Sequence, residues 1–364
     1  MTTRRDTISS YIEWAKLNAG APFNLARSDV ADYPLALLPL ARGDLELTGE
    51  SAYGYAPLQE RLAAKAGVAA DCVVAAIGTS MANHLVMASL LEPGDEVVIE
   101  EPTYEALTDV AGYLGAVVRR FPRRFADGFA LDPAAVEGTV RPRTRLIVVT
   151  DLHNPSSARA DGQALRDVVS IAARRRVHVL VDEVYLEACF DPSARSAFHL
   201  GGNVLTTGSL TKAYGLSGLR CGWILAPPPL AHRMWRLNDL FGVVPPHPAE
   251  RLSVVALDHL PAIAVRAQAL LTRNRRLLDA FLDGRADLDV VRPGAGTIVF
   301  PRWAGGRVDE LCRLLRERYE TSVVPGRFFG APEHFRLGFG GETAMVEEGL
   351  ARLGRALDEL RLAS

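Results

Sequence analysis

The sequence predicts an α/β protein in which helices sandwich a mainly parallel β-sheet and a smaller α+β domain is attached. Between residues 71 and 226, short runs rich in β-branched residues alternate with amphipathic segments of helix length. Most of these runs are continuously apolar, which indicates strands buried on both faces, as in parallel sheets. The chain of 364 residues also exceeds the size of one typical domain.

The sheet is predicted to contain seven strands, each a short apolar run that ends at polar or turn-forming residues. Because α/β sheets bind ligands at the carboxyl ends of their parallel strands, the residues that follow each run are candidates for a functional site. The predicted strands are residues 73–77, 96–100, 116–121, 145–150, 177–182, 204–207 and 222–226.

The rest of the chain is predicted to supply the smaller domain. Three prolines at 227–229 end the sheet region, and the helical region that follows is broken by the prolines at 245–248. A segment rich in Ala, Leu and Arg, residues 263–282, is expected to form one helix that bridges the domains. Further strands are expected near 289–291, 296–300, 322–325 and 335–339, and helices near 308–319 and 342–360.

Composition and charge narrow the possible functions. Hydrophobic residues make up 48% of the chain and charged residues 23%, which excludes fibrous and disordered proteins. A net charge of −2 gives no electrostatic reason to bind nucleic acid or a membrane, so a small-molecule substrate is expected. No apolar run approaches the ~18 residues that span a bilayer. Residues 8–14 have the spacing of a helix interrupted by charge, and not that of a secretory signal.

The cysteines give no sign of a metal or disulfide framework. Cys72, Cys189, Cys221 and Cys312 are scattered through the chain without C-x-x-C spacing. We therefore expect no metal, and a reducing cytoplasm as the location of the protein.

The strongest chemical signal is the stretch Ser209-Leu-Thr-Lys212-Ala-Tyr-Gly-Leu-Ser-Gly-Leu-Arg220. A lysine amine condenses with an aldehyde to form a Schiff base. An arginine fork and nearby hydroxyl groups are the natural partners of a phosphate dianion. Because pyridoxal 5'-phosphate carries both an aldehyde and a phosphate, we expect Lys212 to bind this cofactor, with Ser209 and Arg220 on its phosphate.

This stretch resembles the cofactor-lysine segment S-x-T-K-x-x-G-L-x-G-x-R-x-G-W of the class I and II aminotransferases, the fold-type-I pyridoxal phosphate enzymes. The resemblance implies a large cofactor-binding domain, here residues 46–262, with a seven-stranded sheet between helices. It implies a small domain made of the N-terminal segment 1–45 and the C-terminal part 263–364. It also implies a homodimer with shared active sites.

Asp182-Glu-Val-Tyr185 follows the apolar run 177–181. An aspartate at the carboxyl end of a parallel strand can face the pyridine nitrogen of the cofactor and keep the ring protonated, which makes the ring a better electron sink. The resemblance implies that Tyr185 donates to the phenolic oxygen of the cofactor. Taken alone, Asp-Glu at a strand end is also a common cap for a following helix.

Asp151-Leu-His153-Asn154-Pro-Ser-Ser157 resembles the family segment N-P-x-N-P-T-G. The resemblance implies that Asn154 binds the phenolic oxygen and borders the substrate, whereas an Asn-Pro turn is the structural alternative. The chain departs from the pattern at Asp151, which replaces the first Asn, and at Ser157, which replaces Gly. We expect His153 to be structural.

Two further segments resemble cofactor-binding elements of the family. Gly78-Thr79-Ser80 lies between a predicted strand and a predicted helix, where backbone amides form an anion site. Tyr104 resembles the aromatic residue that stacks on the cofactor ring, with a core tyrosine as the alternative. Tyr53 resembles the tyrosine that reaches the phosphate of the neighbouring subunit, and Tyr55 competes for that role.

Two charged residues are predicted to bind substrate. Arg336, in His-Phe-Arg-Leu-Gly-Phe, resembles the family arginine that pairs with the substrate α-carboxylate in a bidentate manner; an outward-facing charge is the alternative. Asp29 lies in a segment that resembles the mobile substrate loop, where relatives commonly carry Gly. A carboxylate there suits a cationic substrate side chain, and the alternative is a loop aspartate that points to water.

The resemblance implies an aminotransferase that exchanges the amino group between an L-amino acid and a 2-oxo acid through a Schiff base at Lys212. Ser-Leu-Thr-Lys-Ala-Tyr-Gly-Leu, Val-Val-Pro-Gly-Arg and Arg-Leu-Gly-Phe also resemble the capreomycidine synthase group. A lyase or cyclase that acts on a hydroxylated, arginine-like amino acid in specialised metabolism is therefore the alternative. A third hypothesis, a catalytically silent binding module, conflicts with the retention of Lys212, Asp182 and both arginines.

Overall fold

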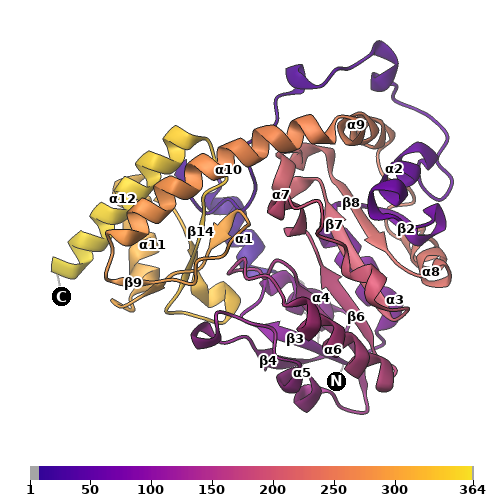
Figure 1. Ribbon diagram of the computed structural model, residues 1–364, viewed down its shortest axis with the longest axis horizontal. Helices are drawn as coiled ribbons and strands as arrows, with labels where there is room; N and C mark the ends of the chain where they lie inside the picture. Colours follow the sequence, from indigo (N-terminus) through magenta and orange to yellow (C-terminus); the bar gives the residue numbers. More distant parts are fainter. Residues whose placement is uncertain (1–7, 363–364) are drawn as a thin grey trace.

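The computed structural model of the chain describes residues 8–362 and has the predicted α/β architecture. Its central sheet has seven strands in the order β2-β8-β7-β6-β5-β3-β4 (Figure 1). All neighbouring strands are parallel except β8, which runs antiparallel to both β2 and β7. The strands are β2 (Val73–Ile77), β3 (Glu96–Glu101), β4 (Val117–Pro122), β5 (Thr144–Thr150), β6 (His178–Asp182), β7 (Val204–Ser209) and β8 (Cys221–Leu225).

Helices cover both faces of the sheet because its central strands are apolar on both sides. In β5, Leu146 and Val148 pack in one hydrophobic cluster, and Ile147 and Val149 pack in another. The first cluster includes residues of α2 (Ala56–Ala66), α3 (Gly78–Leu90), α4 (Glu105–Tyr113), α8 (Pro228–Asn238) and α9 (His247–Asp258). The second includes residues of α5 (Pro133–Thr139) and α6 (Gly162–Arg174).

A long helix, α10 (Leu260–Asp283), connects the sheet region to a second hydrophobic core (Figure 1). Ile263 packs in the sheet core, whereas Ala267 and Leu282 pack in the second core. That core also holds residues of α11 (Val308–Tyr319) and α12 (Thr343–Leu362). The short strands of this region are β9 (Leu288–Asp289), β10 (Ile298–Val299), β11 (Arg302–Trp303), β12 (Thr321–Ser322), β13 (Val324–Pro325) and β14 (Phe335–Gly338).

The strand expected at 322–325 is divided in two in the structure. β12 pairs with β1 (Phe23–Asn24) in a parallel arrangement, while β13 pairs with β14 in an antiparallel one. The predicted strand is divided because its first half pairs with a strand near the N-terminus and its second half with a strand near the C-terminus.

The N-terminal segment packs against the C-terminal part of the chain. It begins with α1 (Ser10–Asn18), and Leu25, Val30 and Ala31 lie in the second hydrophobic core. Leu38, by contrast, packs in the sheet core. The contacts of Leu25, Val30 and Ala31 support our proposal that residues 1–45 and 263–364 form a small domain beside a large domain of residues 46–262, whereas Leu38 and Ile263 contact the core of the large domain.

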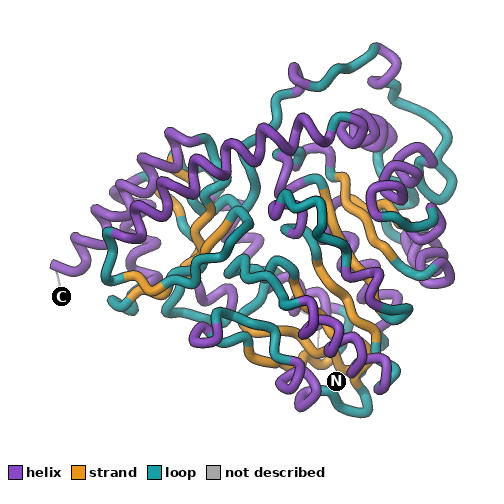
Figure 2. The backbone as a smooth tube through the Cα atoms, viewed as in Figure 1, coloured by secondary structure: helices purple, strands orange, loops and turns teal. Residues whose placement is uncertain are grey.

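Between β1 and α2 the chain is mostly loop, and it extends away from the rest of the molecule at the top of the view (Figure 2). Two short 3₁₀ helices, Leu35–Leu37 and Arg42–Leu45, interrupt this loop. Four leucines on it are exposed, at positions 35, 37, 45 and 47.

Within residues 8–362, no single helix has both the length and the apolar character to span a membrane. The pair α9 and α10, bent by 77° at their junction, meets those two criteria only when taken together.

Candidate active site

A pocket at the carboxyl ends of β5, β6 and β7 brings together most of the residues predicted from the sequence. The N-terminal half of α3, Tyr11 and Ser28 of the N-terminal segment, and β14 complete its walls. Ten predicted site residues line it: Thr79, Ser80, Tyr104, Asn154, Asp182, Tyr185, Ser209, Lys212, Arg220 and Arg336.

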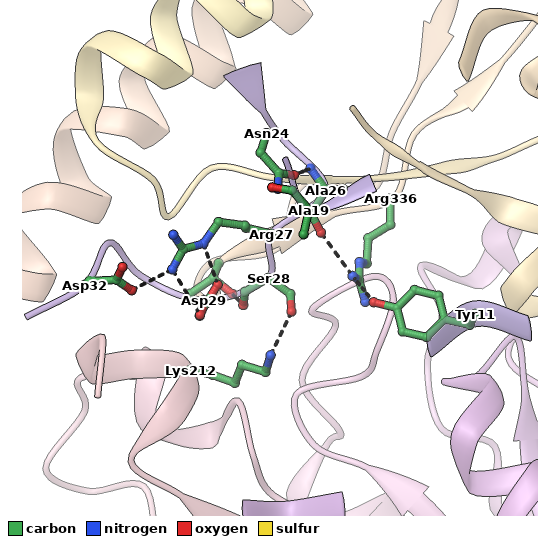
Figure 3. A network of polar contacts seen from close by, with 11 residues as sticks. Tyr11, Ala19, Asn24, Ala26, Arg27, Ser28, Asp29, Asp32, Lys212 and Arg336 are labelled. Carbon is green, nitrogen blue, oxygen red and sulfur yellow. Dashed lines mark hydrogen bonds and ion pairs between the residues drawn. The ribbon is translucent and has the colours of Figure 1, made fainter. Parts of the chain in front are cut away.

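Lys212 lies on a single helical turn, α7 (Thr211–Tyr214), which follows β7 directly. Its Nζ donates a hydrogen bond of 3.0 Å to the hydroxyl of Ser28 (Figure 3). The neighbouring Asp29 pairs with Arg27 at 3.1 Å. Burial alone would raise the pKa of Asp29, but the positive charges of Lys212 and Arg27 outweigh this effect and hold its pKa below the ordinary value.

Asp182 ends β6 as a buried carboxylate, with 3% of the residue exposed. Its Oδ2 accepts a 2.8 Å hydrogen bond from the Asn83 amide, and its Oδ1 accepts a 3.0 Å bond from the backbone N–H of Val184. Burial raises the pKa of Asp182 to about 6, although both hydrogen bonds favour the charged form. Such a carboxylate is suited to a protonated ring nitrogen, which supplies the missing positive charge.

The other end of the pocket has groups that are suited to an anion. Arg220 forms only weak 3.4 Å hydrogen bonds, to the carbonyl oxygens of Ile77 and Ser217, and no acid within residues 8–362 forms an ion pair with it. The Thr79 hydroxyl is buried and has no partner in the described part of the chain. Gly78 adopts φ 75°, and a Cβ atom there would collide with the Arg220 guanidinium. Because Thr79 lies in the first turn of α3, its free hydroxyl and the helix amides suit a phosphate group.

Arg336 lies on β14 and is 1% exposed, so the outward-facing alternative is wrong. Its guanidinium donates to the Tyr11 hydroxyl at 2.7 Å, to the Asn154 side-chain oxygen at 3.1 Å and to the Ala26 carbonyl at 3.3 Å. Figure 3 shows it facing Tyr11 of α1. Its Nε has no partner, and it forms no ion pair with any acid between residues 8 and 362. A buried cation of this kind is suited to an incoming carboxylate.

Three other predicted residues frame the pocket. Tyr185 is buried and packs with Leu152 and Ile298. Tyr104 meets the Tyr11 ring edge-on, with 5.4 Å between ring centroids, and its burial raises its pKa. The backbone N–H of Asn154 donates to the Thr150 hydroxyl at 2.9 Å, which fixes the turn after β5.

The remaining predicted residues lie outside the pocket lining. Tyr53 is 39% exposed, and its hydroxyl accepts a 2.6 Å hydrogen bond from Arg236. Tyr55 packs against His247, and its hydroxyl accepts a 3.3 Å bond from Arg251. In this chain, neither tyrosine contacts the pocket. Asp29 is not among the lining residues, but it directly follows Ser28, which is.

His153 has the structural environment expected for it. The side chain is fully buried, and its two nitrogens bond to the Ser156 hydroxyl at 2.6 Å and to the Pro102 carbonyl at 2.9 Å. Burial holds its pKa well below the ordinary value, so the ring is neutral.

The structure adds residues that the sequence interpretation missed: Tyr11, Ser28, Asn83 and Thr150. For Asn83 a signal existed, because it is a polar residue four positions after Thr79 in the same helix and therefore lies on the same face as Thr79. Tyr11 and Ser28 carry no such signal, since they reach the pocket only through the packing of the N-terminal segment.

A buried ion pair supports the turn that carries Asn154. Arg123 donates to Glu100 at 2.9 Å, and both side chains are fully buried. Glu100 also accepts hydrogen bonds from the backbone N–H and the hydroxyl of Thr150. The Thr150 hydroxyl in turn accepts from Asn154. The Arg123–Glu100 ion pair therefore fixes the position of Thr150 at the end of β5, and through Thr150 that of Asn154 in the pocket wall.

Comparison with known proteins identifies the protein family to which this chain is similar. Residues 16–353 match the family described as aminotransferase class I and II. Capreomycidine synthase from Streptomyces vinaceus is 35% identical over 77% of this chain and 73% of its own length. An arginine–pyruvate transaminase from Pseudomonas aeruginosa is 29% identical over 83% of this chain and 79% of its own.

Two solved structures extend the comparison over nearly the whole chain. A PLP-dependent aminotransferase from Streptococcus suis has a TM-score of 0.91 and 25% identity, and each chain is covered to 99%. The PLP-dependent cyclase OrfR has a TM-score of 0.88 and 28% identity, again with 99% of both chains covered.

Proposed function

Because the chain belongs to the class I and II aminotransferase family, an enzyme family that uses pyridoxal 5'-phosphate, we propose that it exchanges the amino group between an L-amino acid and a 2-oxo acid. One observation carries this proposal. A single pocket holds an amine at Lys212, a carboxylate at Asp182 and two arginines, Arg220 and Arg336, that form no ion pair within residues 8–362. These groups match the aldehyde, ring nitrogen and phosphate of the cofactor and the α-carboxylate of an amino acid.

Different residues of the pocket would bind different parts of the cofactor. Lys212 would hold the aldehyde carbon, and Asp182 the ring nitrogen. Arg220 and the hydroxyls of Thr79, Ser80 and Ser209 would hold the phosphate, beside the tight backbone turn at Gly78. Asn154 and Tyr185 would contact the phenolic oxygen, and Tyr104 the ring face. When bound, the cofactor supplies an electron sink that weakens the Cα–H bond of an amino acid.

The protein's own groups then bind and move protons. Arg336 orients the substrate through its α-carboxylate, and Asn154, which already contacts Arg336, borders the same position. The Lys212 amine takes the proton from the substrate Cα and returns it to the acceptor carbon. The Ser28 hydroxyl holds Nζ of Lys212 in place at 3.0 Å. The N-terminal segment covers this side of the pocket and limits the access of water.

We propose that Asp29 selects a substrate with a cationic side chain. The Asp29 side chain is only 14% exposed, so it does not point to water, and its carboxylate already holds the guanidinium of Arg27. Arg27 also pairs with Asp32 at 2.7 Å, and it can keep that partner while a substrate guanidinium takes its place at Asp29. The transaminase relative named for arginine supports this substrate class.

A second candidate is the elimination and cyclisation of a hydroxylated, arginine-like amino acid. Two observations favour it: capreomycidine synthase shares 35% identity with this chain, and the cyclase OrfR shares its fold along its length. The same pocket serves both reactions because both begin with loss of the Cα proton.

Product analysis separates the candidates. The cofactor-loaded protein is incubated with arginine, 3-hydroxyarginine, aspartate or phenylalanine, its absorbance is recorded, and the products are identified by mass. Pyridoxamine phosphate with a 2-oxo acid indicates transamination, whereas a dehydrated or cyclised product indicates the second candidate. If no amino acid changes the spectrum, both proposals fail. Equal relative rates in wild type and Asp29→Gly would remove the role of Asp29.

We further propose that the enzyme acts in the cytoplasm as a homodimer with shared active sites. Its four cysteines are free thiols. The exposed leucines of the loop between β1 and α2 offer an apolar surface beside Tyr53, which would reach the phosphate of the second copy. Sedimentation measures the assembly, and loss of cofactor affinity in Tyr53→Phe but not in Tyr55→Phe would assign the tyrosine. A monomer with full activity would contradict the proposal.

A further inference from the structure

Asn83 connects the end of β6 to the end of β7 at the floor of the active-site pocket. Asp182 and Thr207 are paired neighbours on these two parallel strands, so their side chains point to the same face of the sheet. Asn83, from the second turn of α3, lies between them. Its Nδ2 donates to Asp182 at 2.8 Å, and its Oδ1 accepts from the Thr207 hydroxyl at 2.7 Å.

The chemistry of the three groups fixes the orientation of the Asn83 amide. An ionised carboxylate can only accept hydrogen bonds, so the NH₂ group must face Asp182. The hydroxyl of Thr207 satisfies the amide oxygen on the opposite side. A flipped amide would place its oxygen against the carboxylate, so that two acceptors would face each other, and the Thr207 hydroxyl would lose the acceptor of its proton. All three residues are at most 4% exposed, so these bonds are largely shielded from water.

This arrangement gives Asp182 a defined direction. One oxygen is held by Asn83 and the other by the backbone N–H of Val184, so the carboxylate cannot rotate freely. Each oxygen has a second lone pair, and the carboxylate still borders the pocket. A hydrogen bond to the charged form also favours that form over the protonated one.

We propose that Asn83, held by Thr207, is a positioning residue that keeps Asp182 ionised and aimed at the ring nitrogen of pyridoxal 5'-phosphate. This inference rests on the proposed role of Asp182. It makes α3 a two-part cofactor element: Thr79 and Ser80 serve the phosphate, and Asn83, about 6 Å further along the helix axis, serves the ring nitrogen through Asp182.

The test reads the proton at the ring nitrogen directly. Wild-type protein and variants are loaded with pyridoxal 5'-phosphate labelled with ¹⁵N in the ring, and the nitrogen chemical shift is recorded at neutral pH. In Asn83→Leu, we expect the signal to move toward that of the unprotonated ring. Loss of one hydrogen bond to a charged group predicts a roughly tenfold change in the proton distribution between Asp182 and the ring, about 1.4 kcal/mol.

Two further variants keep the test decisive. Thr207→Val is nearly isosteric and leaves Asn83 in place, but it removes the hydroxyl that fixes the orientation of the Asn83 amide. It should move the nitrogen signal toward that of the unprotonated ring by a smaller amount than Asn83→Leu. Asn274→Leu is the matched control, because Asn274 is also a fully buried amide but bonds to the carbonyl oxygens of Phe339 and Gly341. It should lower stability without moving the nitrogen signal.

Asp182→Asn separates failure of this inference from failure of the proposed site. If Asp182→Asn moves the signal and Asn83→Leu does not, Asn83 has no role at the nitrogen and the inference is overturned. A control variant at Asn274 that moves the signal equally would also overturn it. If Asp182→Asn itself leaves the signal unchanged, the assignment of Asp182 to the ring nitrogen fails, and the inference fails with it.

Discussion

Replacing Arg336 by lysine tests whether this buried cation binds the substrate carboxylate. A guanidinium has five N–H groups, and three of those in Arg336 are used by Tyr11, Asn154 and Ala26, which leaves two for a ligand. Each hydrogen bond between charged groups contributes about 1.5–3 kcal/mol. Lysine keeps the positive charge but lacks the planar guanidinium that can donate two parallel hydrogen bonds to a carboxylate. We therefore expect the loss of about one hydrogen bond to the substrate carboxylate, which lowers kcat/KM roughly 10- to 150-fold.

The assay compares two substrates in single turnovers followed by the absorbance of the cofactor. One is the amino acid that wild type converts fastest, and the other is the corresponding amine without its carboxylate. Arg336→Lys should slow the amino acid by the stated factor and leave the amine nearly unchanged, because the amine has nothing for the fork to hold. Equal losses for both substrates would refute this reasoning and would indicate that Arg336 only supports the N-terminal segment through Tyr11 and Ala26.

Three further outcomes are expected. Lys212→Ala should abolish the visible absorbance and the borohydride label but change the free energy of unfolding by only about 1 kcal/mol, since Nζ forms one hydrogen bond, to Ser28; a label retained elsewhere would contradict the assignment. Glu100→Gln should destabilise the protein by about 3–5 kcal/mol in chemical denaturation, because it leaves Arg123 as a buried unpaired cation. The double variant Glu100→Leu with Arg123→Met should recover most of that loss, and no recovery would argue against a charge effect. Burial raises the pKa of Glu183 from 4.5 to about 8, so the folded protein holds a proton there that the unfolded chain has released. The free energy of unfolding should therefore fall as pH rises from 4.5 to about 8, and Glu183→Gln should flatten that part of the profile.

The sheet could be predicted because its strands are marked by local sequence. Runs such as residues 145–150 are apolar without alternation, which identifies strands buried on both faces, and β5 begins only one residue earlier than expected. The division of residues 322–325 into β12 and β13 was not predictable, because each half is defined by a partner strand elsewhere in the chain.

The pocket shows the same division between local and distant information. Asp182 and Lys212 were found because each follows a strand and belongs to a recognisable short motif. Ser28 and Tyr11 were not, because their contacts with Lys212 and Arg336 join residues 184 and 325 positions apart. Asn83 shares a helix face with Thr79, but its bond to Asp182 joins residues 99 positions apart and could not be predicted from that face alone.

The sequence by itself determined the α/β class, the cofactor and the chemical groups that approach it, because strand periodicity and short motifs are written in neighbouring residues. Only the tertiary structure decided that Arg336 is buried without an acid partner among residues 8–362, that Asp29 faces Arg27, and that Asn83 holds Asp182. The physical reason is that hydrogen bonds and burial depend on which distant segments pack together, and no single segment of sequence specifies its own partner.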